Sequence, residues 1–392
     1  ANTTGANNTS IGACAGFAVT TGEENVVVGF NTGKSITTGG ANVALGHSAL
    51  QNTTTGGGNT ALGREALLTN TTAGNNTAVG KRALYLNTTG DNSAAVGCGA
   101  LSANTTGGSN VAMGRNALLS NTTANLNTAV GDCALQANTT ASDNTAFGAY
   151  SLRTNTTGAS NVAVGKNSLL SNTTASNNTG VGYNSLFSNT TGTCNTAVGA
   201  DALKVNTTAN ANTAMGFQAL CKNTTGFENT SYGFKAGFAI TTGDYNTNVG
   251  TIAGNGLTTG NNNIILGYNA QATSVSVSNE ITLGNSNNDN LRCADTSISS
   301  LSDLRDKKNI EDLPHGLDYI LALRPVKFDW NTRDGTRKGK KDYGFIAQEL
   351  DKVEEKFGNK EYTRLVSKEN PEKWEADPMK TYPILIKAIQ EL

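Results

Sequence analysis

Residues 76–97 read NTAVGKRALYLNTTGDNSAAVG, and this stretch decides the fold. The segment Asn76 to Gly80 returns 17 positions later as Ser93 to Gly97, and its closing glycine recurs at that interval from Gly12 to Gly284. No insertion or deletion interrupts the series, as expected when every unit stacks on its neighbours. Residues 1–290 are therefore predicted to form one solenoid.

Other columns of the repeat indicate which solenoid it is. The residue before each repeat glycine is apolar, the fourth residue after it is leucine from Leu50 to Leu220, and Thr-Thr follows in every unit from Thr20 to Thr259. Gly, Asn and Thr in each unit are poor helix formers, whereas Thr and Val favour strands. The pattern predicts a mainly β fold, a 17-residue-repeat β-solenoid or β-roll shaft of about 80 Å at one turn per unit.

Within each unit, the segment Asn-Thr-Ala-Val-Gly is expected to be a short strand closed by a glycine turn. The Ala-Leu segment is expected to supply the other inward side, and Asn-Thr-Thr-Gly a return turn whose side chains bond the local backbone. Near both ends of the array Gly replaces the leucine, at Gly16, Gly33, Gly237 and Gly254. We interpret this replacement as degradation of the repeat.

The threonine and asparagine columns allow two other interpretations. Regular threonine arrays on flat solenoids can bind ice, but adjacent threonines point to opposite faces of a strand, so only one of each pair could join a flat surface. The Asn-Thr-Thr sequons from Asn70 to Asn223 are formal glycosylation acceptors. Because they coincide with the repeat, turn chemistry explains them without glycans.

Composition excludes several classes of protein. The formal net charge is −1, which leaves no basic surface for nucleic acid. No apolar run is long enough to insert in a membrane. The six cysteines show no paired spacing, so neither a disulfide framework nor a metal site is expected. No cofactor is expected either.

Most of the charged residues lie after residue 302, and residues 303–392 are predicted to be a separate small α+β domain. We expect helices over 315–323 and from Gln348, strands over 326–330 and 343–347, and a helix over 382–392. The apolar face of this last helix is typical of the first turns of a coiled coil. Residues 291–302 would form the junction.

The start of this domain resembles a known family. Ser302–Ile310 (SDLRDKKNI), Leu323–Phe328 (LRPVKF) and Tyr343–Glu349 (YGFIAQE) are similar, in order, to the signatures of the intramolecular chaperone domain of the self-cleaving S74 peptidase type. The resemblance implies a domain that trimerises, assists folding of the β-structured part before it and releases itself once by autoproteolysis. It also implies Ser302 as nucleophile and Lys307, five residues later, as base.

The residue types fit that chemistry. A serine hydroxyl needs an adjacent base, and a lysine can serve where burial favours its neutral form. The cleaved bond would be one that flanks Ser302, either Leu301–Ser302 or Ser302–Asp303. Because the substrate is the chain itself, no external substrate is expected.

The shaft resembles the head repeats of trimeric autotransporter adhesins and the shafts of phage tail fibres and tailspikes. This resemblance implies a homotrimeric fibre of a virion that attaches to a host-surface receptor or glycan, with other virion tail proteins as further partners. A trimeric adhesin on a bacterial cell surface is the alternative, and an ice-binding or glycan-degrading solenoid is the alternative of another class. Both natural termini are expected to lie beyond Ala1 and Leu392.

Overall fold

The computed structural model describes residues 2–288, 302–332, 338–358, 360–368 and 374–392. The chain divides into two compact units, one ending at Leu283 and the other beginning at Gly284. The first unit is called the shaft below and the second the C-terminal unit.

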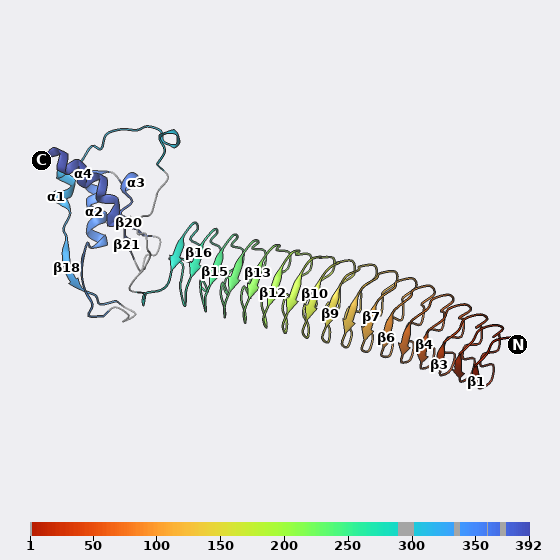
Figure 1. Ribbon diagram of the computed structural model, residues 1–392. Helices are drawn as coiled ribbons and strands as arrows, with labels where there is room; N and C mark the ends of the chain where they lie inside the picture. Colours follow the sequence, from red (N-terminus) through yellow and green to blue (C-terminus); the bar gives the residue numbers. More distant parts are fainter. Residues whose placement is uncertain (1, 289–301, 333–337, 359, 369–373) are drawn as a thin grey trace. The chain divides into compact units, whose positions relative to one another are not determined.

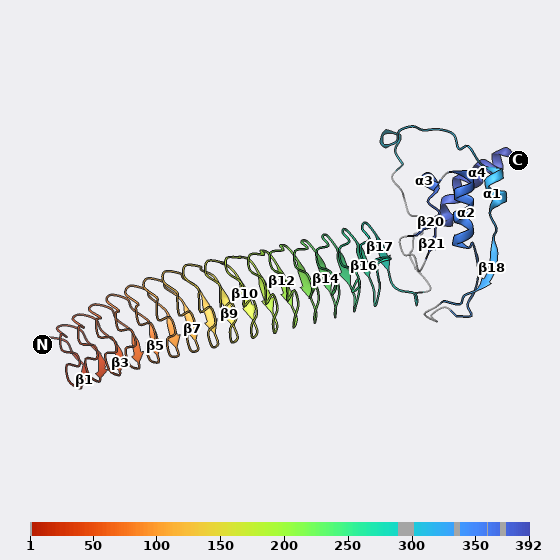
Figure 2. The same cartoon turned by 180° about the vertical axis from the view of Figure 1, so that it is seen from behind.

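The shaft is a parallel β-solenoid with one three-residue strand in each 17-residue coil, which confirms the predicted architecture (Figure 1, Figure 2). Equivalent residues pair in register, so Thr77, Ala78 and Val79 of β5 lie against Ala94, Ala95 and Val96 of β6. The strands are Thr9–Ile11 (β1), Val26–Val28 (β2), Val43–Leu45 (β3), Thr60–Leu62 (β4), Thr77–Val79 (β5), Ala94–Val96 (β6), Val111–Met113 (β7), Thr128–Val130 (β8), Thr145–Phe147 (β9), Val162–Val164 (β10), Thr179–Val181 (β11), Thr196–Val198 (β12), Thr213–Met215 (β13), Thr230–Tyr232 (β14), Thr247–Val249 (β15), Ile264–Leu266 (β16) and Ile281–Leu283 (β17).

The core of the shaft is narrow. The middle residue of each strand points inward, as Ala78 and Ala95 do, and the repeat leucines such as Leu84 and Leu101 close the other side with no exposed surface. The repeat leucines adopt left-handed backbone, with φ of 50° at Leu84. This conformation is unfavourable for a non-glycine residue, so burial of the leucine side chain must compensate for it.

Two ladders of buried asparagines run beside the leucines. In one ladder Asn87 Nδ2 donates to the carbonyl of Gly90 (2.9 Å) in its own turn and to Asn70 Oδ1 (3.2 Å) one coil away. In the other, Asn76 Nδ2 donates to the carbonyl of Gly90 (2.9 Å), and the Asn76 backbone N–H donates to Asn59 Oδ1 (3.0 Å). The asparagines therefore bond both within a turn and along the stack. The sequence predicted only the local bonds.

The threonine turns also bond along the stack. Thr71 Oγ1 donates to the carbonyl of Thr88 (3.1 Å), and Thr88 Oγ1 donates to that of Thr105 (3.0 Å). The second threonine of each pair, such as Thr72 and Thr89, is exposed. Only one threonine of each Thr-Thr pair thus faces solvent, as the alternation of side chains predicted.

The glycine replacements at the ends of the shaft are compensated, so our interpretation of them as degradation was wrong. Where Gly33 takes the leucine position, Ile36 takes the asparagine position and is fully buried. A Cβ at Gly33 would lie 2.8 Å from Ile36 Cδ1. Gly237 and Ile240 make the same exchange near the other end. The aliphatic side chain moves three residues along the coil and still fills the core.

The C-terminal unit is a small α+β assembly, as predicted. Its elements are Leu304–Asp306 (η1), Leu317–Ala322 (α1), Val326–Asp329 (β18), Lys341–Gly344 (β19), Ala347–Phe357 (α2), Lys360–Thr363 (α3), Val366–Ser367 (β20), Glu375–Ala376 (β21), Pro378–Thr381 (η2) and Tyr382–Glu391 (α4). Strands β18 and β19 form an antiparallel pair, as do β20 and β21. Tyr319, Leu350, Leu365 and Ile384 form the core, where α4 packs on α1 (Figure 1).

The boundaries of four elements differ from those expected. The first helix begins at Leu317 rather than residue 315 and ends at Ala322, and β18 ends at Asp329 rather than residue 330. The expected strand over 343–347 is instead β19, Lys341–Gly344, because Ile346 is already the residue that precedes α2. Helix α2 begins one residue before the position expected.

Candidate functional sites

The predicted nucleophile and base lie together in the C-terminal unit. Lys307 Nζ donates a hydrogen bond to Ser302 Oγ over 2.6 Å. The one-turn helix η1 lies between the two residues and reverses the chain, and the Lys307 backbone N–H donates to the carbonyl of Leu304 (3.2 Å). Both side chains are exposed in the single chain.

Asp303, the residue after the predicted nucleophile, caps this turn. Asp303 Oδ1 accepts from the Arg305 backbone N–H (2.9 Å) and from Arg305 Nε (3.0 Å), while Oδ2 accepts from Nη2 (2.6 Å). These hydrogen bonds hold the pKa of the Asp303 carboxyl below its usual range. The sequence named Asp303 only as a flank of the cleaved bond, and Arg305 was given no role.

The structure describes only part of the predicted cleavage site. Leu301, whose carbonyl is one of the two predicted points of attack, lies outside the described residues. Ser302 and Asp303, which flank the other bond, are described. The structure therefore describes the Ser302–Lys307 pair but not the carbonyl group of Leu301.

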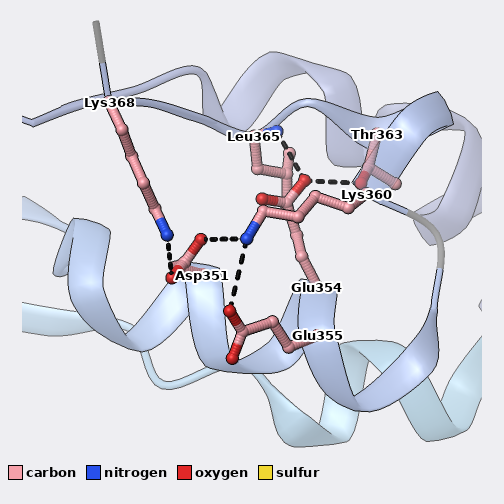
Figure 3. A network of polar contacts seen from close by, with 7 residues as sticks. All are labelled: Asp351, Glu354, Glu355, Lys360, Thr363, Leu365 and Lys368. Carbon is pink, nitrogen blue, oxygen red and sulfur yellow. Dashed lines mark hydrogen bonds and ion pairs between the residues drawn. The ribbon is translucent and has the colours of Figure 1, made fainter.

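A buried polar network holds the second half of the C-terminal unit (Figure 3). Glu354 Oε1 accepts from Thr363 Oγ1 (2.5 Å) and from the Leu365 backbone N–H (2.7 Å), and Asp351 forms ion pairs with Lys360 (2.7 Å) and Lys368. Burial raises the pKa of the Asp351 carboxyl, but the two lysines outweigh this effect and lower it. The network ties α2 to the segment after it, and sequence analysis did not single it out.

Helix α4 has one buried and one exposed apolar side. Ile384 and Ala388 are buried, whereas Leu385 is 42%, Ile389 63% and Leu392 89% exposed. The sequence had placed all of these residues on one helical face. The structure divides them between the core of the unit and a surface that no described residue covers.

The outward face of the shaft strands is uncharged over its whole length. Each strand presents its first and third residues outward: the first is Thr, Val, Ala or Ile and the third is apolar in all seventeen strands. Leu45 is 52%, Phe147 55% and Tyr232 57% exposed. We call this surface the strand face. The apolar column before the repeat glycines is evident in the sequence, but its outward direction was not predicted.

The glycosylation interpretation does not fit the folded shaft. The sequon asparagines from Asn70 to Asn223 are fully buried, and their Nδ2 atoms donate hydrogen bonds in the ladder that contains Asn87. A glycan on Nδ2 would require the coil to open.

Neither a metal site nor a membrane span is found where the structure describes the chain. No group of three His, Cys, Asp or Glu side chains could hold an ion among these residues. No helix there is long and apolar enough to cross a membrane.

Comparison with known families agrees with the signatures. The family model for the chaperone of endosialidase, of the peptidase S74 type, matches residues 302–359. The chain carries a chaperone-of-endosialidase domain at its C-terminus. The matched range contains the dyad, the capped turn and the two buried carboxylates Asp351 and Glu354, whose partners in the network follow residue 359. It follows a β-solenoid shaft. No curated protein matches the chain.

Proposed function

We propose that the protein is a homotrimeric attachment fibre of a virion, whose chaperone domain assembles the shaft and then cuts itself off. The observation that carries the proposal is the uncharged strand face, which runs through all seventeen strands. Monomeric soluble proteins seldom leave apolar patches of more than a few hundred Å² in contact with water, and larger patches mark association surfaces.

A second copy of the chain is the partner that fits this face. The strand face repeats with the period of the coil, so a partner that covers it throughout must have the same period. Copies arranged around an axis satisfy this condition, because each presents the same columns in the same register. The chaperone family supports three copies.

Helix α4 supports the same arrangement within the chaperone domain. Its exposed residues Leu385, Ile389 and Leu392 follow spacings of four and three, which is the spacing of a coiled-coil seam. Three copies of α4 would bury this seam. Trimerisation of the chaperone domain would then bring three shafts together at one end and set their register before the coils stack.

The Ser302–Lys307 dyad supports self-cleavage. The neutral amine of Lys307 takes the proton of the Ser302 hydroxyl, and Oγ attacks the carbonyl carbon of Leu301. The bond from that carbon to the Ser302 nitrogen breaks as the nitrogen gains a proton, which leaves an ester on Oγ. Water then hydrolyses the ester to a carboxylate at Leu301 and a free hydroxyl and amine at Ser302.

Trimer assembly would also activate the dyad. Ser302 and Lys307 are both exposed in one chain. Burial against a neighbouring copy would favour the neutral amine that the chemistry needs. Cleavage would thus follow assembly, as release of a finished shaft requires.

The contacts of the shaft disfavour a glycan-degrading enzyme. Such enzymes need a carboxylic acid poised to donate a proton beside a second carboxylate. Glu65 is ion-paired with Arg82 (2.6 Å) and Arg64 (3.0 Å), and Arg82 holds the pKa of this carboxyl low. Asp132 is paired with Arg115 (2.9 Å) in the same way.

The test is the intact mass and native mass of the full chain, with wild type beside Ser302→Ala. We expect wild type to yield a trimeric shaft and a fragment that begins at Ser302, and Ser302→Ala to remain whole yet trimeric. Lys307→Met should behave as Ser302→Ala does, and Lys308→Met, its matched control, should cleave like wild type. If all four chains stay whole and monomeric, both the assembly and the processing are wrong.

A virion rather than a bacterial surface is the proposed location. Both use long trimeric fibres, and the two are separated by where the protein is found. Antibodies against the shaft should label purified particles at their tails. Labelling of the cells alone would favour the adhesin.

A further inference from the structure

The stretch from Ser302 to Lys307 contains two separate polar pairs. In the first pair, Lys307 Nζ donates a hydrogen bond to Ser302 Oγ. In the second, the Arg305 guanidinium donates to both carboxylate oxygens of Asp303. A carboxylate thus lies directly beside the nucleophile in sequence, yet it contacts an arginine and not the lysine of the dyad.

We propose that Asp303 and Arg305 are positioning residues for self-cleavage. Asp303 holds the turn that brings Lys307 to Ser302, and Arg305 keeps the Asp303 carboxylate from pairing with Lys307. The inference rests on the proposed function and adds two residues to its site.

The first role follows from the geometry of the turn. Two residues five positions apart in an extended chain lie about 17 Å apart, whereas Lys307 Nζ and Ser302 Oγ are 2.6 Å apart. Residues 302–310 are all exposed, so no packing in the single chain holds this bend. The Asp303 side chain accepts the Arg305 N–H, and the Asp303 carbonyl accepts the Asp306 N–H (3.1 Å). These bonds close the turn from its first residue.

The second role follows from charge. A lysine acts as a base only while its amine is neutral, and a nearby carboxylate favours the ammonium form. Arg305 engages both Asp303 oxygens with Nε and Nη2, the paired geometry in which a guanidinium binds a carboxylate best. Without Arg305, Lys307 and Lys308 would be the cations nearest to Asp303 in sequence within this exposed turn. Asp306 and Lys308, the other charged residues of the stretch, flank Lys307 and are exposed.

The experiment measures the rate of self-cleavage in newly synthesised full chain. The chain is made in a cell-free system and shifted to buffers from about pH 6 to about pH 9, the range that brackets a lysine base. The cleaved fraction is followed by intact mass. Native mass confirms that each variant assembles as wild type does, which separates a slow site from a chain that fails to fold.

Two substitutions at Asp303 separate the turn from the charge. Asp303→Ala removes the cap and should slow cleavage about fivefold to tenfold. Asp303→Asn keeps a side-chain oxygen for the Arg305 N–H and should stay within about twofold of wild type, since Asn caps as well as Asp. An Asn variant as slow as the Ala variant would overturn the capping role.

Substitution of Arg305 tests whether this residue keeps the Asp303 carboxylate away from Lys307. Arg305→Gln should slow cleavage about tenfold near pH 7 and move the pH midpoint of the rate up by about one unit. The double variant Asp303→Asn, Arg305→Gln has no carboxylate at position 303 that could pair with Lys307. Its pH midpoint should therefore return to that of wild type. Lys308→Gln, which removes a neighbouring positive charge without touching Asp303, should change neither.

The outcomes distinguish this inference from the function it rests on. A wild-type chain that never cleaves overturns both. A wild type that cleaves beside an Arg305→Gln variant with an unmoved midpoint leaves the function standing and overturns the role of Arg305. So does a double variant that keeps the shifted midpoint of Arg305→Gln.

Discussion

At the scale of single residues, the shaft keeps its core filled by exchanging two positions. Gly33→Leu alone should lower the free energy of unfolding by about 2–4 kcal/mol, because the new side chain meets Ile36 and takes up a left-handed backbone. Adding Ile36→Thr copies the next coil, which has Leu50 and Thr53, and should recover at least about 1 kcal/mol. Urea unfolding of the single and double variants measures this coupling. Additive effects would contradict the exchange.

The limit of sequence analysis is also clearest at single positions. The 17-residue period, the parallel stack and the buried Leu84 column followed from the residues alone. The exchange between Gly33 and Ile36 did not, since two changes three residues apart look like independent losses until both side chains enter one cavity. The Ser302–Lys307 pair came from a family signature, and its 2.6 Å geometry could not be read from a spacing of five.

At the scale of elements, the Asp351 network should set the acid stability of the chaperone domain. Its two lysine partners hold the folded-state pKa of Asp351 below the unfolded value of about 4. The stabilisation is therefore full above that unfolded value and is lost as pH falls through the folded pKa. Asp351→Asn should cost about 1–3 kcal/mol at pH 7 and remove this contribution to the acid dependence.

Thermal unfolding between about pH 2 and pH 7 measures the effect, because linkage makes the slope report the protons taken up. Glu355→Gln is the matched control: Glu355 lies on the same helix and touches Lys360 over 3.4 Å, but it is exposed. It should change stability by less than about 0.5 kcal/mol. Equal losses from the two substitutions would mean that burial of Asp351 is irrelevant.

Which side chains of each strand point into the core is another property of elements that could not be predicted from the sequence. In Thr-Ala-Val either Ala or the pair Thr and Val could point inward, and hydrophobicity alone favours the valine. The coil is too narrow for two large columns, because the repeat leucines already occupy the opposite side. Ala78 therefore points inward and Val79 outward, and the apolar column appears on the surface where a partner is required.

At the scale of the whole molecule, three copies of the chain would associate through the strand face. Charged side chains introduced on this face should therefore dissociate the trimer. Met113→Lys with Phe147→Lys puts two ammonium groups on the strand face, where these side chains are 46% and 55% exposed. In a trimer each position would bring three like charges together and bury them, which costs several kcal/mol per site. We expect native mass to fall from three chains to one, while circular dichroism still reports folded coils.

The matched control places the same two charges elsewhere on the shaft, one on the coil of Phe147 and one on a coil farther along. Ala149→Lys with Ala200→Lys alters the column directly after the repeat glycine, where Lys166 already stands one coil from Ala149. This variant should remain trimeric. If both variants stay trimeric, the chains associate through a different surface. If the wild-type protein is itself a single chain, the exposed Thr and Val columns must bind another ligand. Loss of the trimer in the strand-face variant alone would mean that the apolar column before the repeat glycines exists for association, because nothing inside the coil depends on it.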